Sequence, residues 1–352
     1  MSDLTHGLND QQKAAVTHVD GPLMIVAGAG TGKTHMLTRR IAWLIEQGHA
    51  KPENILALTF TDKAAGEMEE RVDLLLPYGY ADLQISTFHA FCERLLRDYG
   101  AEIGLSRDFK LVSELDAWLL VRQNFDKFDL DYYRPLGNPT KYLKGLLTHF
   151  SRAKDGAITR EDYLSYIENK IADQDGNTTD EDASTELARI KELANAYHTY
   201  QQIILESDSL DFGDLILFSL HLLTSRPKVL ARVREQYKFV LVDEFQDTNH
   251  AQYELVKLIS QPKNNLTVVG DDDQAIYKFR GASLEIILRF ESDFKDLKKV
   301  VLNKNYRSSQ EILDHSHRFI QMNNPNRLEA ASNLSKKLSA EVNDHHLIEH
   351  LH

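Results

Sequence analysis

The chain has 352 residues, of which 42% are hydrophobic and 27% are charged. This length and composition are typical of a soluble globular protein with two or three domains and a sizeable core. The net charge of −12 gives no basic excess and argues mildly against a nucleic-acid partner. Local basic and aromatic contacts can still bind one, so composition leaves that question open.

Two features lead us to expect neither a membrane protein nor a secreted one. The sequence has no run that approaches the ~18 apolar residues of a membrane span, and its first residues are acidic, unlike a signal peptide. The single cysteine, Cys92, rules out an internal disulfide and is expected to be a packed structural thiol. We therefore expect a cytoplasmic location without membrane contact.

The most informative stretch is residues 23–34, where an apolar run is followed by small residues and then by Lys33 and Thr34. This pattern predicts a strand, a tight loop and a helix. Backbone N–H groups of the loop and of the helix N-terminus are expected to surround a phosphate chain. Lys33 is expected to reach the β- and γ-phosphates, and the Thr34 hydroxyl to hold Mg²⁺. The alternative is a flexible glycine turn, but such a turn does not explain why a strand, a small-residue loop, Gly-Lys-Thr and a helix follow one another in this order. The residues expected to hold the nucleotide here are Ala27, Gly28, Ala29, Gly30, Thr31, Gly32, Lys33 and Thr34.

A second apolar run, residues 239–242, ends in two acids, Asp243 and Glu244. An aspartate at the end of a strand beside a phosphate loop can hold Mg²⁺ through water, and the next glutamate can orient or deprotonate the attacking water. Two acids after an apolar run can also be an ordinary exit from a strand. The complete string Asp-Glu-Phe-Gln-Asp-Thr at residues 243–248 favours the hydrolytic interpretation.

Strand and helix patterns alternate along most of the chain, with strands expected at residues 23–26, 55–60, 83–88, 239–242 and 299–302. The alternation predicts an α/β fold, a parallel sheet with covering helices. Between residues 101 and 205 it stops, and an all-helical insertion is expected with helices at 116–128, 139–153, 160–171 and 185–205. Residues 210–216 are expected to return the chain to the α/β part. The predicted domains are an ATPase domain in two parts (1–100 and 206–302), the insertion (101–205) and a final segment (303–352).

Eight ordered segments resemble motifs of superfamily 1 DNA helicases of the UvrD/Rep/PcrA type. The general phosphate-loop pattern begins with glycine, but this chain has Ala27 at that position. Alanine at this position resembles the first motif of these helicases. The other segments are residues 8–16, 59–65, 86–91, 210–216, 243–248, 270–282 and 303–309. The resemblance implies a RecA-like P-loop fold, ATP and Mg²⁺ as ligands, and single-stranded DNA or single/double-strand junctions as partners.

The same resemblance assigns roles to further residues. Gln12, with Gln11 as an alternative, is expected to read the edge of adenine, and Tyr306 to stack on the base. Gln274 is expected to sense the γ-phosphate and Arg307 to contact it. DNA contacts are implied for Thr59, Phe60, Thr87, His89, Tyr277 and Phe279.

Structural roles stay open for two of these residues, and two positions depart from the family pattern. Phe60 at a strand end can pack in the core, and a single histidine such as His89 is more often a hydrogen-bonded structural residue. Phe279 stands where the best-known members carry tryptophan, and a phenyl ring still stacks on bases but offers less area. Asp272 stands where a small residue is expected.

The function implied by the resemblance is ATP-driven movement along single-stranded DNA, with duplex unwinding as its consequence. Nothing after Arg318 resembles the later motifs of the family, which lie in a second RecA-like lobe. We therefore expect residues 303–352 to be the start of that lobe, in a truncated chain or a fragment that lacks the rest of it and is weakly active alone. The alternative is an ATP- and DNA-binding regulatory module that does not translocate. A nucleotide kinase would share the phosphate loop but would not explain residues 59–65 and 270–282. The sequence indicates no particular protein partner.

Overall fold

The computed structural model describes residues 4–76, 83–174, 181–275, 284–332 and 334–342. Its internal contacts divide the chain into two compact units, one made of Met1–Ala90 and Lys228–His352 and the other of Phe91–Pro227. In the part of the chain that the structure describes, no helix combines the length and the apolar character needed to cross a lipid bilayer.

The first unit is built on a six-stranded sheet formed by β1 (Leu23–Ala27), β2 (Ile55–Thr59), β3 (Gln84–Thr87), β6 (Phe239–Val242), β7 (Leu266–Gly270) and β8 (Lys298–Leu302). The strand order is β3-β2-β6-β7-β1-β8, and every neighbouring pair is parallel. All residues of β1, β2, β6 and β7 are buried, as expected for a parallel sheet covered on both faces. The predicted α/β fold with a parallel sheet is confirmed.

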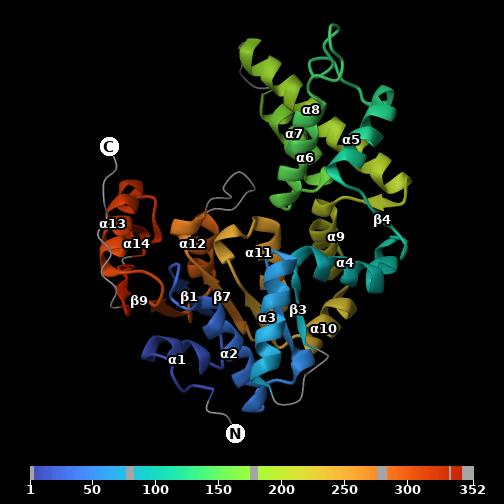
Figure 1. Cartoon of the computed structure of the whole chain (residues 1–352). Coiled ribbons are helices and arrows are strands. Elements are labelled where there is room, and N and C mark those ends of the chain that lie inside the picture. The colour runs from blue at the N-terminus through green and yellow to red at the C-terminus, as the bar shows by residue number, and fades with distance from the viewer. Residues whose placement is uncertain (1–3, 77–82, 175–180, 276–283, 333, 343–352) are drawn as a thin grey trace. The chain divides into compact units, whose positions relative to one another are not determined.

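Helices cover both faces of this sheet (Figure 1). One face carries α1 (Asp10–Val16), α2 (Lys33–Glu46) and α3 (Asp62–Leu75), and the other carries α11 (His250–Ser260) and α12 (Leu284–Asp293). The connections from β1 to β3 run one way across the sheet, and those from β6 to β8 run the other way. Because crossovers between parallel strands are right-handed, a change of direction puts the connecting helices on the opposite face. A further helix, α10 (Pro227–Gln236), precedes β6.

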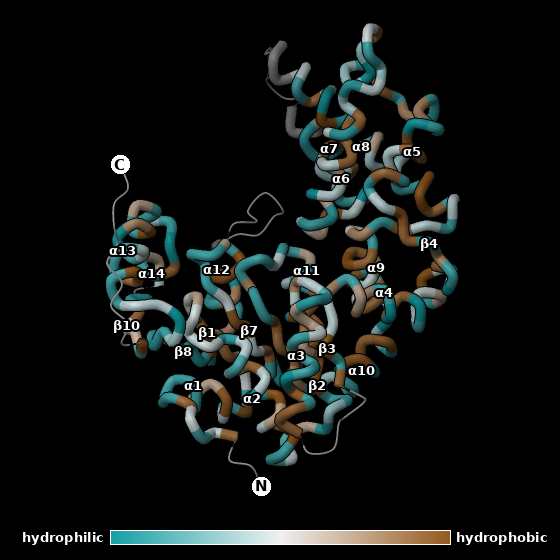
Figure 2. The backbone as a smooth tube through the Cα atoms, in the orientation of Figure 1, coloured by the Kyte–Doolittle hydropathy of each residue, from teal (hydrophilic) through white to brown (hydrophobic). Residues whose placement is uncertain are grey.

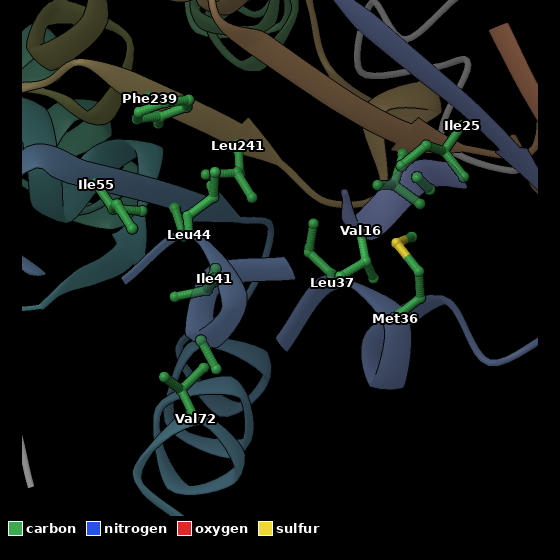
Figure 3. Packing of buried hydrophobic residues seen from close by; sticks show 14 of the residues in the cluster. Val16, Ile25, Met36, Leu37, Ile41, Leu44, Ile55, Val72, Phe239 and Leu241 are labelled. Carbon is green, nitrogen blue, oxygen red and sulfur yellow. The ribbon is translucent and has the colours of Figure 1, made fainter. Parts of the chain in front are cut away.

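The core between the sheet and the first three helices consists of apolar side chains from alternate strand positions (Figure 3). Leu23 and Ile25 of β1 and Leu241 of β6 share one cluster with Leu37 and Ile41 of α2, and all five are at most 1% exposed. Full burial of such a side chain contributes about 1.5–3 kcal/mol relative to leaving it in water. This packing fixes the start of α2 at the carboxyl end of β1.

The phosphate loop lies at a point where the connections of the sheet change direction. β1 and β7 are neighbours, but β1 leads to a helix on one face and β7 to a helix on the other. Such a switch leaves a crevice outside the carboxyl ends of the two strands, where open α/β sheets bind ligands. Residues 28–32 follow β1 at this edge, and residues 271–275 follow β7. The fold therefore brings two of the predicted motifs together.

The residues after β8 remain part of the first unit. β9 (Lys304–Asn305) pairs in parallel with β10 (Ser339–Ala340), and α13 (Gln310–Ile320) and the short α14 (Leu328–Ala331) lie between them in sequence. The Gln310 side chain holds β10 by donating to the carbonyl of Leu338 at 3.2 Å and accepting from the N–H of Ala340 at 2.8 Å. Leu338 lies so close to the phosphate loop that a Cβ on Gly28 would be 3.1 Å from it.

The second unit is mostly helical. It contains the greater part of α4 (Phe88–Tyr99), then α5 (Glu114–Gln123), α6 (Leu143–Asp155), α7 (Arg160–Gln174), α8 (Glu181–Glu206) and α9 (Phe212–Ser225). The ring of Phe150 stacks on those of Tyr197 and Tyr200 in its core, with 5.3 and 5.2 Å between ring centroids. All four helices predicted between residues 101 and 205 are present, with ends shifted by a few residues.

The prediction for residues 210–216 was wrong, because they do not return the chain to the α/β part. In the second unit β5 (Ser209–Leu210) pairs with β4 (Lys110–Leu111), and α9 follows directly. Many residues of α9 are apolar, as their brown colour in Figure 2 shows, and they are largely buried. The second unit consequently extends beyond the predicted insertion at both ends.

A buried ion network is the physical reason for this difference. Nζ of Lys154, on α6, lies 2.6 Å from Asp211 and 2.8 Å from Asp214, and the Lys154 side chain is fully buried. The two aspartates also form the capping box that starts α9. A buried charge requires opposite charges close by, so Lys154 holds the start of α9 in the second unit.

Candidate nucleotide-binding site

The phosphate loop is closed by its own bonds and by its glycines. The Thr31 hydroxyl donates to the carbonyl of Gly28 at 2.8 Å, and Gly30 and Gly32 have φ angles of 76° and 82°. These angles are unfavourable for residues with a side chain. A Cβ on Gly30 would also lie 2.7 Å from Nδ2 of Asn305. Gly30 is therefore required both by the turn and by the close approach of Asn305.

Asn305 ties two predicted nucleotide contacts to this loop. Its Nδ2 donates to the carbonyl of Ala29 at 2.7 Å, and its Oδ1 accepts from the N–H of Arg307 at 2.9 Å. The N–H of Tyr306 donates to the carbonyl of Gly30 at 2.9 Å. The buried Asn305 side chain thus holds Tyr306 and Arg307 beside the phosphate loop. Its place inside the segment 303–309 was the only sequence signal for this role.

The two residues predicted to bind adenine meet at the start of α1. Asn9 caps this helix, with its Oδ1 accepting from the N–H of Gln12 at 2.9 Å and its N–H donating to Oε1 of Gln12 at 3.2 Å. Nε2 of Gln12 donates to the carbonyl of Thr31 at 3.1 Å, so its amide is oriented by the phosphate loop. Nδ2 of Asn9 donates to the Tyr306 hydroxyl at 3.0 Å, and the Tyr306 side chain is 46% exposed. Gln12 and Tyr306 therefore share the partner Asn9.

The second of the two acids that follow β6, Glu244, contacts the lysine of the phosphate loop. Nζ of Lys33 lies 2.8 and 3.0 Å from the two carboxylate oxygens of Glu244. Nε2 of Gln246 donates to the same carboxylate at 2.8 Å. Glu244 has a φ of 49°, which is uncommon for a residue other than glycine, and the backbone turns sharply at this point. Two residues that the sequence suggested separately, Lys33 and Glu244, thus form one ion pair.

Asp243 is the buried member of the acid pair. It is 8% exposed, and its Oδ1 accepts from the N–H of Glu244 at 3.0 Å. Burial and then the charge of Glu244 raise the pKa of Asp243 to about 6, although Lys33 lowers it. No basic side chain among the described residues forms an ion pair with Asp243, so its ionised form is unfavourable. A divalent cation would relieve this, and Asp243 therefore fits the metal role predicted for it and Thr34.

Asp243→Asn is expected to raise the free energy of unfolding by about 1–3 kcal/mol at pH 7.5 in EDTA. The sign follows from the pKa of about 6, which lies above the usual 3.8, so the folded chain holds this proton more tightly and ionisation costs stability. The difference from wild type should shrink as the pH falls from 7 toward 4. Urea unfolding at pH 7.5 and 5.0 measures it, with the exposed Asp296→Asn as the control. An Asn variant less stable than wild type at pH 7.5 would contradict this account.

Gln274 ends the short 3₁₀ turn η5 (Asp272–Gln274) that follows β7. Its Nε2 donates to Oδ2 of Asp271 at 2.7 Å, and the N–H of Asp271 donates to Oε1 of Gln246 at 3.0 Å. Since Gln246 also donates to Glu244, hydrogen bonds connect the predicted γ-phosphate sensor to the ion pair with Lys33. Gln246 was not singled out from the sequence, although it lies within the string at residues 243–248.

Two of the predicted DNA contacts lie at the ends of neighbouring strands. Thr59 ends β2 and Thr87 ends β3, and the two are register partners. The Thr59 hydroxyl donates to the carbonyl of Thr61 at 3.0 Å, and the Thr87 hydroxyl accepts from the N–H of Ala90 at 3.2 Å. Both hydroxyls therefore stabilise the turns that leave this edge of the sheet.

Of the aromatic residues predicted to contact DNA, the structure describes Phe60 and His89. Phe60 directly follows Thr59 and is half-buried, and His89 in the first turn of α4 is half-buried too. Burial lowers the pKa of His89, although Asp62 raises it. Tyr277 and Phe279 lie outside the described residues. The structure thus brings Thr59, Phe60 and Thr87 to one edge of the sheet.

The chain matches known proteins over most of its length. Residues 8–295 match the family model of the UvrD/REP helicase N-terminal domain. The chain belongs to the UvrD/REP helicase family. The resemblance seen in the sequence motifs is confirmed, and the phosphate loop, the acid pair and Gln274 all fall within the matched residues of this UvrD/REP helicase domain.

Curated bacterial proteins of the UvrD/REP helicase family are similar to the chain. "ATP-dependent DNA helicase PcrA" of Leuconostoc citreum is 40% identical over 324 residues, covering 91% of this chain and 40% of that protein. The PcrA helicase of Bacillus subtilis strain 168 is 40% identical over 327 residues, covering 93% and 41%. A "Probable DNA helicase II homolog" of Rickettsia felis is 41% identical over 330 residues, covering 92% and 46%. The chain spans less than half the length of these curated relatives.

Proposed function

We propose that this protein binds and hydrolyses ATP and couples the reaction to movement along single-stranded DNA, as the motor domain of a DNA helicase. The observation that carries the proposal is the ion pair between Lys33 and Glu244, to which Gln274 is joined by hydrogen bonds. The arrangement supports hydrolysis because it combines a phosphate-binding cation, a proton acceptor and a polar amide in one place. The names of the relatives, which are ATP-dependent DNA helicases, support the same reaction.

The residues at this site fit ATP and Mg²⁺. Backbone N–H groups of residues 28–34 and the N-terminus of α2 would hold the phosphates. Thr34 and Asp243 would hold the metal, which when bound neutralises phosphate charge and polarises the terminal phosphoryl group. The further residues that we assign to the nucleotide are Gln12, Tyr306 and Arg307.

The ion pair gives the chain a way to keep its base inactive until nucleotide is present. In the structure Glu244 is neutralised by Lys33 and oriented by Gln246. Lys33 exchanges Glu244 for phosphate oxygens when nucleotide binds, which releases the carboxylate. Glu244 remains oriented by Gln246 and accepts a proton from the attacking water. Lys33 thus serves first as the partner of the base and then as a phosphate ligand.

Single-stranded DNA, alone or at a junction with duplex, is the partner that we propose. Phe60 lies next to the Thr59–Thr87 pair at the carboxyl edge of the sheet. An aromatic ring in such a position stacks on any base, which gives affinity without sequence preference. This kind of contact also suits a protein with a net charge of −12, because stacking does not require a basic surface.

Phe60→Ala is expected to weaken single-stranded DNA binding by about 1–3 kcal/mol, the usual range for one base–aromatic stack. The loss should be the same for oligonucleotides of different sequence and should leave ATP affinity unchanged. Fluorescence anisotropy of labelled oligonucleotides measures it. Phe319→Ala is the matched control, since Phe319 on α13 is 72% exposed and lies away from β2 in sequence. Equal DNA affinity in the two variants would assign Phe60 to core packing.

The proposed reaction is tested by phosphate release from ATP and by DNA binding, both measured on the full chain. We expect Mg²⁺-dependent release of inorganic phosphate, and binding of single-stranded DNA without sequence preference. Transfer of phosphate to a nucleoside monophosphate, without DNA binding, would contradict the proposal and would indicate a nucleotide kinase.

A further inference from the structure

A buried lysine near the end of the described chain contacts the three acids that precede Gln274. Nζ of Lys336 lies 2.5 Å from Asp271, 2.5 Å from Asp272 and 2.7 Å from Asp273, and the Lys336 side chain is 5% exposed. One oxygen from each acid lies within 4.8 Å of the others, a spacing that suits a cation. Burial alone would lower the pKa of Lys336, but the carboxylates of Asp271 and Asp272 raise it. The ammonium of Lys336 is therefore a cation that all three acids share.

Further bonds join the same turn to the 327–336 segment that carries Lys336. Both carboxylate oxygens of Asp273 accept from Arg327, each at 2.7 Å. Oδ2 of Asp272 accepts from the N–H of Leu328 at 2.7 Å. Asp272, which departs from the family pattern, thus bonds to the 327–336 segment twice, through Leu328 and through Lys336. These two bonds explain why an acid stands at position 272 in this chain.

Asp271 connects the 327–336 segment to the nucleotide site. Its Oδ1 accepts from Nζ of Lys336, and its Oδ2 accepts from Nε2 of Gln274 at 2.7 Å. A single carboxylate therefore joins the ammonium to the amide, and the orientation of the amide depends on how firmly that carboxylate is held. The N–H of Asp271 fixes the turn to Gln246 on the other side.

We propose that Lys336 is a positioning residue for nucleotide sensing: it locks Asp271 so that Gln274 presents its amide to the γ-phosphate of ATP. Without the ammonium, Arg327 still compensates Asp273, but the carboxylates of Asp271 and Asp272 lose their common cation and repel each other. The turn at residues 271–274 then relaxes, or one of its carboxylates takes up a proton. In both cases the carboxylate of Asp271 no longer holds the amide of Gln274 in a fixed orientation. The inference rests on the proposed function, because it assumes that Gln274 distinguishes ATP from ADP. ADP has no γ-phosphate, so its affinity should not depend on Lys336.

The test compares affinities for ADP and for a non-hydrolysable ATP analogue, measured on the full chain by displacement of fluorescent ADP. Lys336→Met keeps the side-chain length and removes the charge, whereas Lys336→Arg retains a charge. Lys337→Met is the matched control, because the Lys337 side chain is 63% exposed and its Nζ is 3.9 Å from Asp314. We expect Lys336→Met to lose about tenfold in affinity for the ATP analogue relative to ADP. Lys336→Arg should restore most of the loss, and Lys337→Met should match wild type.

An ATP-to-ADP affinity ratio that is the same in wild type and Lys336→Met would overturn the inference. Circular dichroism and ADP affinity report whether the variant is folded. If it is not, Lys336→Met combined with Asp272→Asn removes one acid together with the cation and provides the same comparison. A wild-type chain that binds neither nucleotide would refute the proposed function and this inference together. ADP binding with an unchanged ratio would refute the inference alone.

Discussion

Lys33→Ala is expected to weaken Mg·ATP binding by about a hundredfold and to reduce ATP turnover to background. Each hydrogen bond to a charged group contributes about 1.5–3 kcal/mol, and the ammonium of Lys33 can reach more than one phosphate oxygen. In the wild-type chain Glu244 lies 2.8 Å from Nζ of Lys33, and the substitution leaves this carboxylate without its cation. An uncompensated negative charge then lies beside the phosphates, so both effects oppose nucleotide binding.

Lys51→Ala is the matched control for this substitution, because Lys51 belongs to the same unit and its side chain is 79% exposed. Titration with a fluorescent ATP analogue measures affinity, and phosphate release measures turnover. If the Lys33 and Lys51 variants have equal affinity and equal turnover, the assignment of residues 27–34 as a phosphate loop is wrong.

Glu244→Gln is expected to cut ATP turnover by about 10²–10⁴, the usual contribution of a general base. The amide keeps the shape of the side chain but cannot accept the proton of the attacking water. Mg·ATP affinity should stay the same or rise, because Lys33 no longer has to leave an ion pair before it binds phosphate. Turnover and affinity are therefore expected to separate in this variant and to fall together in Lys33→Ala.

Single-turnover phosphate release and equilibrium nucleotide titration measure the two quantities for Glu244→Gln. Glu235→Gln, which changes an exposed acid of α10 in the same unit, is the control. Parallel losses of affinity and turnover in Glu244→Gln would assign a structural role to this carboxylate instead of a chemical one.

Strands and loops of the first unit were predictable because local patterns encode local geometry. The apolar run of β1, the glycines after it and the start of α2 can be recognised without knowing what they contact. The pairing of Lys33 with Glu244 is different, since the two residues are 211 positions apart. Spacing alone cannot predict such a contact, and the expectation that their segments share a site came from the resemblance to a family.

Contacts that depend on the return of a distant segment could not be predicted. Lys336 and Lys337 look alike in the sequence, yet one is buried against three acids and the other is exposed. Both lysines precede β10, and only the return of this distant segment to β9 brings Lys336 to Asp271. Residues 210–216 were assigned to the α/β part for a similar reason, because nothing in that segment indicates that its acids pair with Lys154.

A crystal structure of the chain with Mg²⁺ and a non-hydrolysable ATP analogue would show whether nucleotide occupies the phosphate loop and separates Lys33 from Glu244. We expect the phosphates along residues 28–34, the metal between Thr34 and Asp243, and Lys33 turned from Glu244 to the terminal phosphates. Tyr306 should lie against the adenine and Gln274 near the γ-phosphate. A nucleotide bound elsewhere, or an ion pair between Lys33 and Glu244 that persists with nucleotide in place, would contradict the account.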